Sequence, residues 1–426
     1  MARLRLSRLV EDMLNRPSAI REIMRMTDDN NVRRMGLDPT DIISFGGGWV
    51  GHKAPERLRE IYQNICADPQ IFHEAGAYPP TPGLRACREQ LARLDEELFG
   101  MNVSEDNVLI SQSSTQLTHD IFRAIANPGD CVVLLDPTYA NYYGQLVFSL
   151  THYNGNTKPE AKVAYLKTFD AETWSFMPDV DASIGELEEI FRKEKPRSML
   201  IPSPDNPTGQ VVGDKFVKAA LELCQENDAY LVLDYAYKTQ CFLDTLPDYY
   251  SWSPEEFENL ILIYSNSKWA RGLGRRMGWI MASEMVITGL TQMLNYSLLC
   301  ADNLHQLAMA GFLDQTLDDG SLKNYLDETC NAYKKAAKVT VEAFDEYCGS
   351  RRLVPQGGLY TLVELGDGSE AFVTEVMKNT GVLFVPGFGF GESARPGVRV
   401  SYGPLVNDVE RIEEGMRRVG KYLHES

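Results

Sequence analysis

Between about residues 105 and 285, short apolar runs alternate with longer stretches in which apolar residues recur at helical spacing. The clearest apolar runs lie at 108–111, 131–135, 198–202, 230–234 and 260–264, and a further run lies at 278–282. Strands that are buried on both faces read as continuous apolar runs, without alternating polar residues. The pattern therefore predicts an α/β fold whose large domain has a mainly parallel, doubly wound sheet.

Helical periodicity fills the intervals between these strands. The expected helices span 114–126, 183–194, 213–227 and 284–312. Pro128-Gly129-Asp130 ends the first of them, and Pro196 ends the second, because proline and glycine interrupt helical hydrogen bonding.

The order of predicted helices and strands changes after residue 320. A long helix over 320–347 is followed by short strands within 352–364 and 397–402 and by a final helix over 406–424. This order indicates a smaller α+β domain. We expect an N-terminal segment (1–45) that joins the small domain, a large domain (46–315) and a small C-terminal domain (316–426).

Composition excludes several classes of protein. The net charge is −18, and no run rich in lysine and arginine offers a surface to nucleic acid. No apolar run approaches the ~18 residues of a membrane span. The eight cysteines are scattered without a CxxC pair, and the histidines show no metal-binding spacing, so we expect free thiols, no metal and a cytoplasmic protein. Glu11 and Asp12 argue for an ordinary amphipathic N-terminal helix rather than a transit peptide.

Polar residues follow the predicted parallel strands. Ligands bind at the carboxyl ends of strands in an open parallel sheet, so these residues are the candidates for chemistry. Strand 108–111 leads into Ser111-Gln-Ser-Ser-Thr115, strand 198–202 into Ser203-Pro-Asp-Asn-Pro-Thr-Gly209, strand 230–234 into Asp234-Tyr-Ala-Tyr237, and strand 260–264 into Ser265-Asn-Ser-Lys268. Each string alone is an ordinary turn or helix cap. A carboxylate, an amide, a phenol, a lysine and hydroxyls at one sheet edge together predict a binding site.

These strings, in this order, resemble the class I/II aminotransferases, which are pyridoxal-5′-phosphate (PLP) enzymes of fold type I. The resemblance covers nearly the whole chain. Its further members are Phe45-Gly-Gly-Gly48, Ala77-Tyr78-Pro-Pro-Thr-Pro-Gly83-Leu-Arg85, Pro128-Gly-Asp130, Pro137-Thr-Tyr139, Arg276 and Val398-Arg399-Val-Ser.

The resemblance implies a role for each residue around the cofactor ring. Lys268 would form the Schiff base with PLP and move the substrate proton, which requires the lowered pKa that a desolvated lysine has. Asp234 would pair with the pyridine nitrogen. Tyr237 and Asn206 would bind the ring oxygen, and Tyr139 would stack on the ring, although packing in the core is an alternative role for Tyr139.

The cofactor phosphate needs hydrogen-bond donors and positive charge. Ser114 and Thr115 begin a predicted helix, whose N-terminal N–H groups favour an anion. The resemblance adds the Ser265 hydroxyl, the Arg276 guanidinium and the Tyr78 hydroxyl of a neighbouring subunit, which implies a homodimer. The alternative for Tyr78 is a place in a rigid proline-rich turn.

Two departures from the family pattern leave questions open. Ser113 stands where the family usually has glycine, which leaves open which hydroxyl or amide meets the phosphate. Ser113, Ser114 and Thr115 are all candidates. Arg271 and Arg275 are additional arginines in the lysine loop, and they either meet a distal substrate carboxylate or remain solvated.

The resemblance implies that Arg399 binds the substrate α-carboxylate with its planar guanidinium. A surface position on its strand is the alternative. Gly47, Trp49 and Asn206 are the other candidates for the substrate side of the site. Trp49 either restricts substrate size or packs in the core.

The expected activity is transfer of an amino group from an L-amino acid to a 2-oxo acid by a ping-pong mechanism. A PLP-dependent lyase or oxidase with the same cofactor site is the alternative enzyme, because fold and cofactor do not determine the reaction type. An aminotransferase-like domain of a transcription regulator is disfavoured by the acidic charge. The sequence does not identify the amino acid.

Overall fold

The computed structural model describes residues 5–15, 23–151, 161–349 and 351–425. The expected N-terminal helix appears as α1 (Arg8–Leu14), and the first four residues of that expectation lie outside the described part. None of the described helices is long and apolar enough to cross a membrane.

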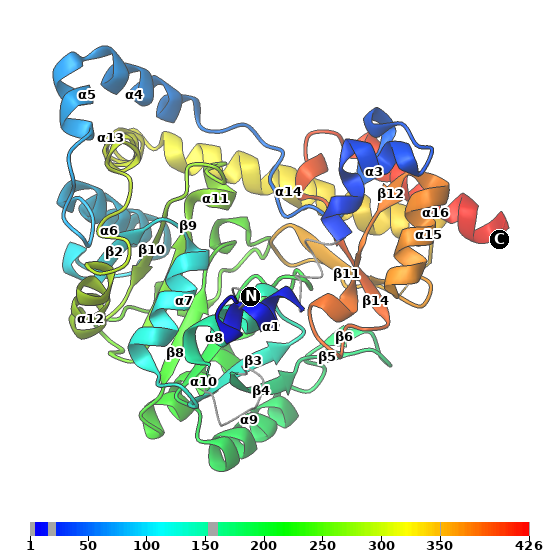
Figure 1. Cartoon of the computed structure of the whole chain (residues 1–426), viewed down its shortest axis with the longest axis horizontal. Helices are drawn as coiled ribbons and strands as arrows, with labels where there is room; N and C mark the ends of the chain where they lie inside the picture. Colours follow the sequence, from blue (N-terminus) through cyan, green and yellow to red (C-terminus); the bar gives the residue numbers. More distant parts are fainter. Residues whose placement is uncertain (1–4, 16–22, 152–160, 350, 426) are drawn as a thin grey trace, which may run out of the picture.

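A seven-stranded sheet forms the centre of the larger part of the molecule (Figure 1). Its order is β2 (Val108–Ser111), β10 (Gly278–Met281), β9 (Leu260–Ser265), β8 (Tyr230–Asp234), β7 (Ser198–Pro202), β3 (Cys131–Asp136) and β4 (Lys162–Lys167). Only β10 runs antiparallel to its two neighbours. The predicted α/β fold with a mainly parallel sheet is therefore confirmed, and β4 is an edge strand that the apolar pattern did not indicate.

The side chains of the central strands alternate between two separate cores. On β8, Leu231 and Leu233 face the first core, whereas Val232 faces the second. This alternation explains the continuous apolar runs, because both faces of the sheet are covered by helices. The first core is closed by α4 (Glu56–Ala67), α6 (Arg85–Phe99), α9 (Val180–Glu194), α10 (Asp214–Glu226) and α13 (Asn303–Asp318), and the second by α7 (Ser114–Ile125), α8 (Asn141–Leu150) and α12 (Glu284–Leu294).

The single helix predicted over 284–312 is wrong. The chain forms two helices, α12 and α13, with an irregular connection at 295–302. Leu299 has a left-handed backbone conformation, with a φ of 69°. The Asp302 carboxylate then accepts a hydrogen bond from the His305 N–H at 2.6 Å and so caps α13. Apolar spacing continues across this interruption and conceals it.

A smaller sheet lies beside the large one. It consists of β11 (Tyr360–Glu364), β14 (Gly397–Ser401) and β13 (Val385–Pro386) in antiparallel order. The helices α14 (Ser321–Tyr347), α15 (Glu370–Thr380) and α16 (Val409–Glu425) accompany this sheet. Figure 1 shows α14 running from the large sheet towards the small one.

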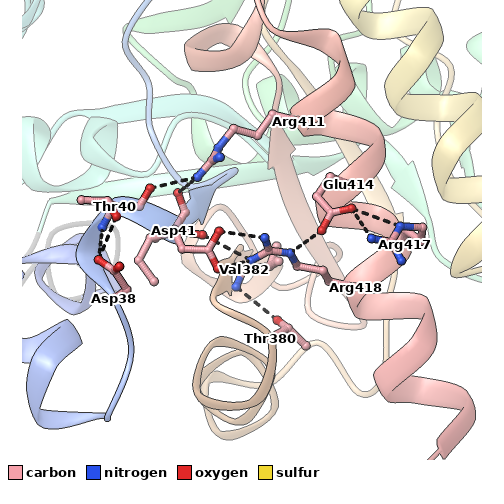
Figure 2. Close-up of polar contacts among 10 residues, drawn as sticks. Asp38, Thr40, Asp41, Thr380, Val382, Arg411, Glu414, Arg417 and Arg418 are labelled. Carbon is pink, nitrogen blue, oxygen red and sulfur yellow. Dashed lines mark hydrogen bonds and ion pairs between the residues drawn. The ribbon is translucent and has the colours of Figure 1, made fainter.

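Residues 23–45 pack with the core of the smaller part, whereas Leu9 of α1 packs against the second core of the large sheet. Strand β1 (Ile43–Ser44) pairs in parallel with β12 (Val382–Leu383). In Figure 2 the Arg418 guanidinium binds the Asp41 carboxylate, with distances of 2.9 and 2.8 Å, while its Nε donates to Glu414 at 2.8 Å. Arg411 donates to the Thr40 and Ile42 carbonyl oxygens. These contacts hold the chain just before the glycine run at 46–48, and Gly48 of that run lines a cavity.

Candidate active site

A cavity of about 610 Å³ opens where β7, β8 and β9 end, and the small sheet closes its other side. Both sheets contribute to its wall, because Asp234 ends β8 and Arg399 lies on β14. The predicted site residues that border it are Trp49, Ser114, Thr115, Tyr139, Asn206, Asp234, Tyr237, Ser265, Lys268, Arg276 and Arg399.

Lys268 lies on α11 (Asn266–Trp269), the short helix that follows β9. The Ser265 hydroxyl caps this helix by accepting the Ser267 N–H at 3.2 Å. The Lys268 Nζ donates to the Gly48 carbonyl oxygen at 2.6 Å. Burial lowers the pKa of Lys268, and nearby Arg399 and Arg276 lower it further, whereas Tyr360 and Asp234 raise it. The amine is therefore easier to deprotonate than that of an ordinary lysine.

A second buried lysine, Lys238, has a different environment. Its Nζ lies 2.6 Å from the Asp95 Oδ1 and donates to the Tyr250 carbonyl oxygen at 2.9 Å. The ring of Phe99 lies 3.9 Å from the same atom, centroid to Nζ. Both charged side chains are almost fully buried and neutralise each other, and Lys238 does not border the cavity. Lys238 is thus part of the packed interior, and its amine does not reach the cavity.

Asp234 places a buried carboxylate at the end of β8. Its Oδ2 accepts the Tyr142 hydroxyl at 2.7 Å, and its Oδ1 accepts the Ala236 N–H at 2.9 Å. Burial raises the pKa of Asp234, an effect that these two hydrogen bonds and the Lys268 charge oppose. A carboxylate in this position favours a cation or a strong hydrogen-bond donor in the cavity beside it.

Arg399 is buried without a carboxylate partner. The side chain is 1% exposed, and no ion pair among the described residues includes it. Its Nη1 donates to the Asn206 Oδ1 at 3.0 Å, its Nη2 donates to the Gly46 carbonyl oxygen at 2.7 Å, and its Nε has no partner within the described chain. The guanidinium carbon lies 4.4 Å from the Tyr360 ring centroid. A buried, unbalanced guanidinium is suited to bind an anion that enters the cavity.

Tyr237 completes this part of the wall. Its hydroxyl is 2.9 Å from the Tyr360 hydroxyl, and burial raises the pKa of Tyr237 well above its usual value. The Lys268 Nζ lies 5.6 Å from the Tyr237 ring centroid. Tyr139 also borders the cavity, and its hydroxyl accepts the Asn141 amide N–H at 2.7 Å.

Four further residues of the cavity wall can donate hydrogen bonds. Ser114 and Thr115 form the first turn of α7, and Ser265 and Arg276 stand beside them in the cavity wall. A Cβ atom on Gly278 would lie 2.5 Å from the Ser114 nitrogen, so the glycine allows α7 to begin close against β10. A helix N-terminus together with a guanidinium is a favourable arrangement for a phosphate.

Three of the predicted residues do not border the cavity. The Ser113 hydroxyl accepts the Gln116 N–H at 3.2 Å and so caps α7. Gly47 lies behind the Trp49 ring, and Gly48 contributes to the wall instead. Tyr78 is 84% exposed on the surface of its own chain.

Several residues of the wall are not among those predicted from the sequence. Tyr142 binds Asp234, Tyr360 binds Tyr237, and Met24 adds an apolar side chain. Tyr142 lies one helical turn after the predicted Tyr139, so helical spacing could have indicated it. Nothing in the local sequence marks Met24 or Tyr360, because long-range packing brings both to the cavity.

Comparisons with known proteins identify a family, relatives and structural neighbours of this chain. A model of the family described as Aminotransferase class I and II matches residues 52–418. The aspartate aminotransferase of Thermotoga maritima is 25% identical over 385 residues, which cover 90% of this chain and 92% of that protein. A relative of the same name from Pyrococcus horikoshii is 25% identical, covering 90% and 91%. The structure of Thermus thermophilus aspartate aminotransferase with maleate superposes with a TM-score of 0.80 at 24% identity, covering 98% of this chain and 100% of that one.

The environment of Lys268 predicts how its amine titrates in the protein without cofactor. We expect trinitrobenzenesulfonate to modify Lys268 with a midpoint pH below the ordinary lysine pKa of 10.5, because burial disfavours the ammonium. Asp234→Asn removes a charge that raises the pKa and should lower the midpoint further. Arg399→Met removes a charge that lowers the pKa and should raise it. Peptide mass spectrometry across pH measures the three midpoints, and equal midpoints would contradict this electrostatic account.

Proposed function

The chain belongs to the class I and II aminotransferases, which use PLP, and from this premise we propose how its own residues transfer an amino group from an L-amino acid to a 2-oxo acid. The relatives are aminotransferases, so a lyase or oxidase activity is not favoured. One observation supports the proposal above the others. The depressed-pKa amine of Lys268 and the unbalanced guanidinium of Arg399 share one cavity.

The residues of the cavity fit PLP. The buried Asp234 carboxylate has only neutral donors from the described chain, and a protonated pyridine nitrogen would supply the missing positive partner. The start of α7, Ser265 and Arg276 suit the phosphate. Lys268 offers the amine that would hold the cofactor covalently. When bound, PLP supplies an electron sink that stabilises negative charge at the substrate Cα.

We propose that Arg399 binds the α-carboxylate of the amino acid and that Lys268 removes the Cα proton. The backbone supports this pairing, because Arg399 binds the Gly46 carbonyl and Lys268 binds the Gly48 carbonyl, two residues further along. Asn206 holds the Arg399 Nη1 and so orients the guanidinium fork. The amino acid and the 2-oxo acid then occupy the same cavity in turn, which corresponds to ping-pong kinetics.

We further propose a homodimer with composite sites, in which the exposed Tyr78 hydroxyl reaches the phosphate in the partner's cavity. Large apolar side chains around it support an interface, because Ile71, Phe72 and Tyr296 are 41%, 54% and 92% exposed. The eight cysteines are all free thiols, which supports a reducing compartment, and we propose the cytoplasm.

Activity measurements test the two central residues. Lys268→Ala should lower kcat by at least about 10²–10⁴-fold, because proton transfer loses its base. Arg399→Lys should lower kcat/KM by about 10–100-fold, the equivalent of the ~1.5–3 kcal/mol of hydrogen bonds to a charged group. The exposed Lys323→Ala serves as a matched control and should leave the rate unchanged. Full activity of the Lys268→Ala protein would refute the proposed role.

Hybrid dimers test whether Tyr78 acts on the partner's site. Lys268→Ala and Tyr78→Ala proteins should each be impaired as pure dimers. After they are mixed and allowed to exchange subunits, each hybrid dimer should contain one site with both an intact Lys268 and an intact Tyr78. Activity should therefore rise above the mean of the two pure proteins. If Tyr78 serves its own subunit, no hybrid site is intact and activity does not rise.

A further inference from the structure

Within the described part of the chain, no cation of the cavity is left for a carboxylate on a substrate side chain. Among the described residues, Lys268, Arg276 and Arg399 are the cations that border it. Under the proposed function, on which this inference rests, Lys268 holds the cofactor, Arg276 faces the phosphate and Arg399 binds the α-carboxylate. An acidic side chain would therefore enter the cavity without a partner, which is unfavourable in a partly desolvated site.

The two additional arginines of the lysine loop, Arg271 and Arg275, do not supply a further cation to the cavity. The Arg271 Nη1 donates to the Val50 and His52 carbonyl oxygens and so ties the lysine loop to the segment after the glycine run. The Arg275 Nη1 donates to the Arg271 carbonyl oxygen at 3.3 Å, and its guanidinium lies over the Tyr62 ring, 5.7 Å from the centroid. Neither side chain borders the cavity.

The segments around Tyr78, which the proposed dimer brings to the partner's cavity, also lack a cation. The Thr81 hydroxyl donates to the Asn295 Oδ1 at 2.7 Å, and the Asn303 amide donates to the Ala77 carbonyl oxygen at 3.1 Å, so these segments form one surface. No lysine or arginine occurs at 74–84 or at 277–322. This surface instead presents the rings of Tyr78 and Tyr296, which are 84% and 92% exposed.

The substrate end of the cavity has an apolar wall. Trp49 follows directly after Gly48, whose carbonyl binds Lys268, and it lines the same cavity as Lys268 and Arg399. The ring covers Gly47 so closely that a Cβ there would lie 2.3 Å from the Trp49 Cζ3. Trp49 is nevertheless 43% exposed, which leaves apolar area for a ligand to cover. Met24 and Leu273 are further apolar residues that line the cavity.

We propose that the amino-acid substrate has a large aromatic side chain that packs on Trp49. The relatives from Thermotoga maritima and Pyrococcus horikoshii are named for aspartate, and our inference assigns this chain a different substrate class. No second cation for the side chain borders the cavity among the described residues, which argues against aspartate. The exposed indole and tyrosine rings favour an aromatic ring over a short aliphatic chain.

The test measures the half-reaction of the holoenzyme with one amino acid at a time, followed by the absorbance of the bound cofactor. We expect the second-order rate constant of the half-reaction to be at least about 10-fold higher for L-phenylalanine and L-tyrosine than for L-aspartate. It should also be higher than for L-leucine. Trp49→Ala should lower the phenylalanine rate by about 10-fold and change the alanine rate little, whereas Trp49→Phe should retain most of the phenylalanine rate. A faster reaction with aspartate or with leucine overturns the inference.

Calorimetric binding of unreactive acids to the same holoenzyme gives a readout without turnover. Phenylpropionate should bind more tightly than succinate, and Trp49→Ala should remove most of that difference. Tighter binding of succinate overturns the inference. Failure of the proposed function is distinguishable, because then no amino acid leaves the cofactor in an amino form that a 2-oxo acid converts back. Reversible conversion by aspartate alone leaves aminotransfer intact and overturns only the aromatic assignment.

Discussion

The carboxyl ends of β7, β8 and β9 lie side by side, and this constraint brings together loops that are separated by many residues in the chain. Asn206, Asp234 and Lys268 each follow or end one of these strands. The strands are fixed by two apolar cores, one on each face, so the polar groups at their ends have little freedom to move apart. The chemistry of the cavity therefore depends on the packing of side chains that never contact a ligand.

The cavity also depends on the small sheet, because β14 supplies Arg399 to it. His52 connects the two parts of the molecule through hydrogen bonds. Burial lowers the pKa of His52 to about 4, so its ring is neutral near pH 7. Its Nε2–H donates to the Trp269 carbonyl oxygen at 3.1 Å, and its Nδ1 accepts the Tyr333 hydroxyl of α14 at 2.6 Å. The loop after the glycine run is thus bound both to the lysine loop and to the long helix. Unpaired charges on Asp234 and Arg399 face a cavity that the fold holds open between them.

The sequence predicted the large sheet and most of the groups at its edge, because buried parallel strands produce long apolar runs and glycine, proline and asparagine mark the turns after them. It failed where the deciding contact is remote. The helix break at 295–302 follows from a cap at Asp302, and Tyr360 and Met24 reach the cavity through tertiary packing. The Ser113 hydroxyl caps α7, and its contact with the phosphate stays a prediction. The roles assigned to the site residues stay proposals that rest on this geometry.

The most direct test of the account is to identify the lysine that carries the cofactor. The holoenzyme is reduced with borohydride, digested and sequenced by mass spectrometry, so that the bond between PLP and its lysine becomes permanent. The account predicts the modification at Lys268, which alone of the two buried lysines described above borders the cavity and lacks a carboxylate partner. Modification at Lys238 or at a surface lysine, with Lys268 unmodified, would contradict it.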